Sequence, residues 1–284
     1  LVLAVPLTIC LIVLGRHVGR LEFLDILLGN RPALPAHELL YQRLLAGDPH
    51  EVAWRAQEVL RERSLISYYD QVMLPGLRRA HLDIVRGAVA GERLECVIRS
   101  AREAIALLAE RANARPTLTA ASGETAAAVE QISDTSTLDR LAKLDVARAP
   151  KERRIALLHG DHPLDELPTL MLAQVLRSFG LPVEVARLST LHECPLHGDA
   201  RPWLVFLSYM EPLSTLHLRA ASIAVHRHLP NACVALCLWQ EMDEGNLSAL
   251  RGRLRVAAIA NTTLEAVEAA IISPLRRPAE AVAA

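Results

Sequence analysis

The run Ile155-Ala156-Leu157-Leu158, followed by His159-Gly160-Asp161-His162-Pro163, sets the pattern of the C-terminal half: a short apolar stretch that ends in polar residues. Similar apolar runs recur at 183–185, 203–207, 233–238 and 256–259. Amphipathic helices are predicted between them, at 164–179, 213–228, 247–251 and 264–272. Strands that alternate with helices favour a parallel sheet covered on both faces. Residues 151–276 are therefore predicted to form a flavodoxin-like, doubly wound five-stranded sheet of order 2-1-3-4-5.

Residues 31–113 show a different, helical period. Apolar side chains recur at spacings of three and four, for example at Leu40, Leu44, Leu74 and Leu77. This spacing predicts helices with one buried stripe, and four of them joined by short turns form a small bundle. Three local signals are expected to bound these helices. They are an N-cap at Asp48 with Pro49 behind it, a second N-cap at Ser64, and a kink or break at Pro75.

The first residues are strongly apolar. Residues 1–14 carry no charge, and Arg16 and Arg20 follow directly. A membrane crossing needs roughly 20 apolar residues, so we expect residues 1–30 to be the end of a transmembrane region and an exit helix. The arginines would keep everything after about residue 16 in the cytoplasm, at the inner membrane, with the lipid bilayer and an upstream transmembrane region as partners. A buried core helix is the alternative.

Amino-acid composition indicates which remaining segments lack a core and which partners are not expected. Residues 114–150 have few large apolar side chains and are predicted to be a disordered linker, and 277–284 form a tail. The formal net charge of −1 gives no reason to expect a nucleic-acid partner, and we expect Arg78 and Arg79 on a solvated helix face. Five cysteines without a disulfide spacing indicate reduced thiols. Cys233 and Cys237 should share one buried strand face.

Polar residues that follow the predicted strands are the candidate ligand contacts. In an open parallel sheet the ligand lies at the carboxyl ends of the strands. Strand 3 runs into Ser208-Tyr209-Met210-Glu211 and strand 4 into Trp239-Gln240-Glu241. The predicted ligand-binding residues are His159, Gly160, Asp161, His162, Ser208, Tyr209 and Trp239. The chain has no Gly-x-Gly-x-x-Gly or Walker motif to hold nucleotide phosphates.

Two segments contain residue types that bind metals. His159, Asp161 and His162 lie within four residues, and the run His192-Glu193-Cys194-Pro195-Leu196-His197 is a second candidate. Neither matches a standard zinc spacing, so a hydrogen-bonded turn and a loop are the preferred interpretations, and we expect no metal site. No Ser-His-Asp or Cys-His arrangement can be assembled, so no catalytic residue is predicted and we do not expect an enzyme.

The N-terminal part resembles the end of the membrane region of the autoinducer-2 exporter family, the PerM-like permeases. The resemblance is carried by the runs Leu14-Gly15-Arg16-His17-Val18, Leu21-Glu22-Phe23-Leu24-Asp25, Tyr41-Gln42-Arg43-Leu44-Leu45-Ala46-Gly47-Asp48 and Leu74-Pro75-Gly76-Leu77. It implies the cytosolic regulatory or assembly region of a permease that exports a small molecule. We also expect a homo-oligomer, and we expect the α/β domain at 151–276 to act as a sensor that binds a small-molecule ligand.

The order of a helical cap and a flavodoxin-like domain resembles the cobalamin-binding module of methyltransferases and light-sensing regulators. Gly160-Asp161-His162 and Ser208-Tyr209 lie where that module has its ligand-bearing loops. The lower cobalt ligand of that family comes from an Asp-x-His-x-x-Gly motif, whereas here Asp161 and His162 are adjacent and no glycine follows. We therefore expect no bound cofactor.

These observations leave three functional hypotheses. The first is the regulatory region of a membrane permease. The alternative is a soluble cobalamin-binding-like module for sensing or methyl transfer. The third is a metal-dependent enzyme that uses His159, Asp161, His162 or the 192–197 loop, and a purely structural scaffold is the remaining alternative.

Overall fold

A five-stranded parallel sheet forms the centre of the C-terminal half. The computed structural model describes residues 34–61, 63–114, 135–142, 144, 154–191, 202–211, 214–254 and 256–272. The strands are β1 (Ile155–His159), β2 (Val183–Arg187), β3 (Leu204–Tyr209), β4 (Cys233–Leu238) and β5 (Ile259–Ala260). Their order is β2-β1-β3-β4-β5, and every pairing is parallel. The predicted flavodoxin-like topology is confirmed.

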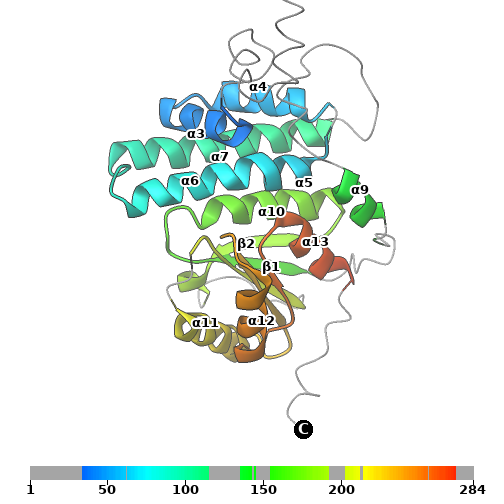
Figure 1. The fold of residues 1–284 in the computed structure, drawn as a ribbon. Coiled ribbons are helices and arrows are strands. Elements are labelled where there is room, and N and C mark those ends of the chain that lie inside the picture. Colours follow the sequence, from blue (N-terminus) through cyan, green and yellow to red (C-terminus); the bar gives the residue numbers. More distant parts are fainter. Residues whose placement is uncertain are drawn as a thin grey trace, which may run out of the picture.

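Helices cover both faces of this sheet (Figure 1). Helices α10 (Glu166–Ser178) and α13 (Thr263–Ile272) lie on one face, and α11 (Thr215–His228) and α12 (Glu244–Arg253) lie on the other. Side chains alternate accordingly, because successive strand residues point to opposite faces. Phe206 packs on the α10 side and Leu207 on the α11 side.

The two strand cysteines are inside the protein, as predicted. Cys233 and Cys237 are buried on the α10 side of β4, and neither forms a disulfide within the described residues. Burial raises the pKa of the Cys237 thiol well above its ordinary value. A protonated, enclosed thiol is a packing group, not a nucleophile.

The N-terminal half is the predicted helical bundle. Its elements are α3 (Ala36–Ala46), α4 (Pro49–Val59), α5 (Leu65–Tyr68), the π-helical turn η2 (Tyr69–Met73), α6 (Leu74–Val85) and α7 (Glu92–Ala114). Asp48 accepts a hydrogen bond from the backbone N–H of Glu51, and Ser64 accepts one from that of Ser67. Both predicted N-caps are confirmed. Gly47 ends α3 at φ 75°, where a Cβ would lie 2.9 Å from Cys96 Sγ.

The break predicted at Pro75 takes the form of a π-helical turn. Proline has no backbone N–H and cannot continue the regular hydrogen-bond ladder. The wider turn η2 absorbs this defect immediately before α6, so α5, η2 and α6 form one continuous rod. The turn also directs Tyr69 and Asp70 towards the sheet domain.

One apolar core joins the bundle to the sheet. It runs from the bundle through α10 and α13 to the adjacent sheet face. Figure 1 shows α7 and α6 stacked above α10, with the sheet below it. The Tyr69 hydroxyl hydrogen-bonds with the side chain of Gln174, and Asp70 accepts hydrogen bonds from the backbone N–H groups of Thr263 and Leu264. The bundle therefore packs against the sheet domain through a shared apolar core and buried hydrogen bonds.

A helix occupies part of the stretch predicted to be a linker. Helix α9 (Thr135–Ala142) lies within 114–150, and Arg140 forms an ion pair with Glu268 of α13. Leu141 and Leu144 pack against the common core. The prediction of disorder is therefore wrong for residues 135–142, because Leu141 in the helix and Leu144 just after it pack against an apolar partner surface.

Several predictions lie outside the described residues. They concern the transmembrane region and exit helix at 1–30, most of the linker, the 192–197 loop and the tail at 277–284. Within the described ranges, no helix combines the length and the apolar character that a membrane crossing requires.

Candidate functional site

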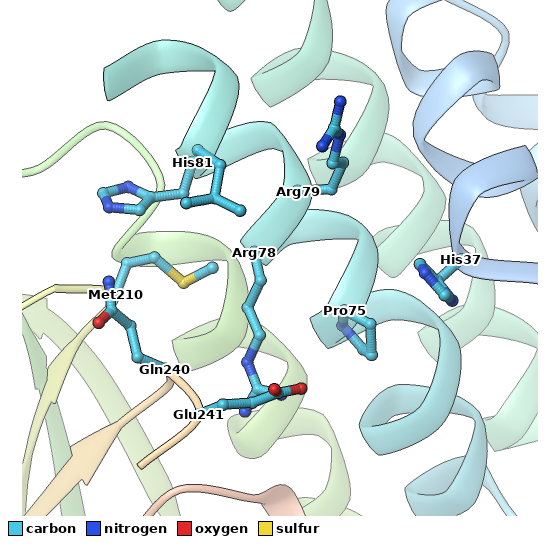
Figure 2. A pocket seen from close by; sticks show the side chains of 9 residues that line it. His37, Pro75, Arg78, Arg79, His81, Met210, Gln240 and Glu241 are labelled. Carbon is cyan, nitrogen blue, oxygen red and sulfur yellow. The ribbon is translucent and has the colours of Figure 1, made fainter. Parts of the chain in front are cut away.

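Helix α6 crosses the carboxyl edge of the sheet and contacts it mainly through Arg78 and His81 (Figure 2). The guanidinium of Arg78 donates from Nε to the carbonyl of Trp239 and from NH2 to the carbonyl of Asn261, at 3.2 Å. Trp239 directly follows β4 and Asn261 directly follows β5. A third bond, 3.2 Å long, joins NH1 to the carboxylate of Glu241. One bundle side chain thus spans the ends of two strands.

His81 contacts the loops that follow β1 and β3. Its Nε2 lies 2.5 Å from a carboxylate oxygen of Glu211, and its ring packs edge-on against the ring of His162 with 4.9 Å between centroids. The pKa of His162 is lowered, first by burial and then by the neighbouring His81, while Glu211 opposes this shift. The bundle therefore closes directly over the turn that follows β1.

Asp165 joins the β1 and β3 loops beneath this contact. Its carboxylate accepts hydrogen bonds from the backbone N–H of Met210, at 2.6 Å, and of His162, at 3.2 Å. Asp165 is buried, and this burial raises its pKa to about 6, although both hydrogen bonds act in the opposite direction. Gly160 packs against it so closely that a Cβ would lie 2.4 Å from the carboxylate and 2.7 Å from the Tyr209 ring.

Three of the predicted ligand contacts lie in the interior. Ser208 and Tyr209 belong to β3 itself, one step before the expected loop, and Trp239 is fully buried. The indole N–H of Trp239 donates to Ser208 Oγ at 2.8 Å, and Ser208 Oγ hydrogen-bonds with the Thr169 hydroxyl at 2.6 Å. The polar atoms of Ser208 and Trp239 are therefore paired inside the protein, whereas the buried hydroxyl of Tyr209 has no hydrogen-bond partner among the described residues.

The histidines and the aspartate after β1 do not converge. His159 is buried, with Nδ1 2.8 Å from the carbonyl oxygen of Gly160, whereas Asp161 is exposed and accepts a hydrogen bond from the Ser189 hydroxyl. In the part of the chain that the structure describes, no three His, Cys, Asp or Glu side chains are grouped to hold a metal ion.

A cavity of about 370 Å³ lies between α6 and the sheet edge (Figure 2). Its volume is in the lower range of small-molecule sites. The lining residues are His37, Pro75, Arg78, Arg79, His81, Leu82, Met210, Gln240 and Glu241. None of the predicted ligand contacts lines it, but their neighbours Met210, Gln240 and Glu241 do. Whether the predicted contacts touch a ligand stays a prediction.

The sequence does not predict the bundle side of this site. Arg78 was expected on a solvated face, but only 18% of its side chain is exposed and its guanidinium bonds to the sheet. That expectation is wrong, because the partners of Arg78 are more than 160 residues away in the chain. The local sequence signal for this contact is weak: Arg78 and His81 lie three residues apart, on one side of the helix that begins near Pro75.

The residues present do not fit a histidine-ligated cobalamin. His162 is the residue nearest to that family's ligand position, and its Nδ1 already accepts a hydrogen bond from the backbone N–H of Leu164. Nε2 is left, but the His81 ring packs against the His162 ring and His162 does not line the cavity. A corrin above His162 would require α6 to leave its observed position.

Comparisons with known proteins give little further guidance. No family model and no curated protein matches the chain. Among solved structures, a cobalamin-binding protein from Desulfitobacterium hafniense DCB-2 is similar to it, with 11% sequence identity and a TM-score of 0.32. The match covers 81% of this chain and 94% of that one. A likeness this distant carries no argument about function.

Proposed function

We propose that this chain is a small-molecule-binding sensor module whose ligand lies between the helical bundle and the carboxyl edge of the flavodoxin-like sheet. The observation that supports it is the cavity, because its walls come from both parts: α3 and α6 on one side, and the segments after β3 and β4 on the other. Open α/β sheets bind ligands at this edge.

Binding there would be coupled to how the bundle sits on the sheet. Arg78 and His81 line the cavity and also bond to the sheet domain. A ligand that contacts them more favourably in one arrangement of α6 shifts the population towards that arrangement. This coupling is what a sensor requires, and it needs no catalytic group.

The test is a thermal-shift screen of the whole chain with four probes of similar size: benzoate, phenyl phosphate, benzamidine and benzyl alcohol. A probe at a hundred times its Kd stabilises the folded state by about 2.7 kcal/mol, which raises Tm by several degrees. Leu82 lines the cavity and is 45% exposed, so Leu82→Trp should fill the cavity and abolish the shift.

Val85→Trp is the matched control, since Val85 is on the same helix, 67% exposed and outside the cavity. It should leave the shift unchanged. Equal shifts in wild type and Leu82→Trp would place the ligand elsewhere, and no shift with any probe would count against the proposal.

The cobalamin-binding alternative is tested by adding hydroxocobalamin to the same protein. Because His81 packs on the His162 ring, we expect the absorbance spectrum of the corrinoid to remain that of the free compound. A spectral change that His162→Ala removes would favour this alternative over our proposal.

A further inference from the structure

We propose that Arg78 binds the anionic group of the ligand, and that the ligand class is a small organic acid: a carboxylate or phosphate ester on a compact apolar body, which takes the place of Glu241. This inference rests on the proposed function, since it assigns a ligand class to the same cavity.

The guanidinium of Arg78 is held in position before any ligand arrives. Two of its three hydrogen bonds go to backbone carbonyls of Trp239 and Asn261 at the ends of strands. These carbonyls belong to the rigid sheet edge, so little side-chain freedom remains to be lost on binding. A preorganised guanidinium is the usual partner of carboxylate and phosphate groups in proteins.

The third partner of Arg78 can be replaced. The Glu241 side chain is 84% exposed, whereas that of Arg78 is 18% exposed. An ion pair with one exposed, flexible member contributes little, because water and entropy offset the attraction. An external anion in the cavity would keep the charge pairing of Arg78 and release Glu241 to solvent.

The other charged side chains near Arg78 have partners of their own and do not occupy the position that a ligand anion would take. Asp70 also acts on Arg78 electrostatically, but its two carboxylate oxygens accept hydrogen bonds from Thr263 and Leu264. Arg79 lines the cavity and forms a 3.6 Å ion pair with Asp83. The cavity wall thus presents cationic side chains with one exposed carboxylate against them.

The apolar wall defines the rest of the ligand. Pro75, Leu82 and Met210 line the cavity beside Arg78, and Gln240 supplies an amide. A ring or short branched chain that carries one acid group fits this combination and the volume of about 370 Å³.

The test measures binding of benzoate, phenyl phosphate and neutral benzyl alcohol to the full chain by calorimetry, in a buffer free of phosphate and sulfate. Both anions should bind and benzyl alcohol should not. Glu241→Gln removes the competing carboxylate and leaves the two backbone bonds of Arg78 intact, so the anions should bind about two- to fivefold more tightly. Arg78→Gln should weaken them more than about tenfold.

Arg86→Gln is the control for net charge, because Arg86 lies at the end of α6 on the exposed surface and outside the cavity. Its anion affinity should equal that of wild type. Unchanged affinity in Glu241→Gln overturns the inference, as does failure of both anions to bind either wild type or Glu241→Gln. Binding of benzyl alcohol, or a rise in Tm with benzamidine, that Leu82→Trp abolishes would support the proposed function while contradicting the anion assignment.

Discussion

Asp165 makes the stability of the protein depend on pH. In an unfolded chain an aspartate titrates near pH 3.9, whereas burial raises the pKa of Asp165 to about 6. Between these values the folded protein holds a proton that the unfolded chain has released. The free energy of unfolding should therefore fall by up to about 3 kcal/mol as the pH rises from 4 to 6, and this contribution is constant above pH 6.

Urea denaturation at half-unit pH steps checks this expectation. Asp165→Asn cannot titrate and should flatten the curve in this window, while an amide oxygen can still accept the hydrogen bond from Met210. Asp161→Asn changes an exposed carboxylate in the same turn and should keep the wild-type slope. An unaltered slope in Asp165→Asn would assign the pH dependence to another group.

At the scale of elements, helix α13 receives its N-terminal cap from the bundle. Asp70 in the π-helical turn accepts hydrogen bonds from the backbone N–H groups of Thr263, at 2.6 Å, and Leu264, at 3.1 Å. Asp70→Ala should lower the free energy of unfolding by about 1–2 kcal/mol and speed amide hydrogen exchange in α13. Asp48→Ala, which removes a cap within the bundle, should cost a similar amount without affecting exchange in α13.

Local causes explain which elements were predictable from sequence. The caps at Asp48 and Ser64 act on N–H groups three residues away, and the central strands β1, β3 and β4 are built mainly from contiguous apolar residues. Five strands with helices between them admit few topologies, so the strand order was predictable as well.

The candidate site was less predictable, because its contacts are long-range. Asp70 meets α13 across 193 residues, and His81 meets Glu211 across 130. The spacing of apolar residues within a helix or strand gives no information about contacts between residues so far apart in the chain. The predicted end of the third strand is also too early: β3 continues through Ser208 and Tyr209, which are both buried, and Ser208 Oγ hydrogen-bonds with the Thr169 hydroxyl. Because the third strand is predicted to end before Ser208, the predicted ligand contacts are Ser208 and Tyr209 and do not include Met210, which lines the cavity.

For the whole molecule, the continuous core predicts that the bundle and the sheet domain unfold together. Trp54→Phe would leave fluorescence only from Trp203 and Trp239, both in the sheet domain, while far-UV circular dichroism reports mainly helices. The two signals should give the same urea midpoint, because the bundle shares its core with α10 and α13. Two separate transitions would show that the contact between the parts is weak.

Membrane attachment also belongs to this scale and stays a prediction from residues 1–30. The chain that includes these residues should sediment with membranes after a high-salt wash, and a version that begins at residue 31 should remain in the supernatant. If both versions stay in the supernatant, the permease interpretation loses its main support.

The two enclosed thiols of β4 have a practical consequence. Since Cys233 and Cys237 lie in the core that both halves share, a thiol-modifying reagent can reach them only when that core opens. Their rate of alkylation therefore counts opening events without any introduced label, and a ligand that fastens the bundle to the sheet would slow it.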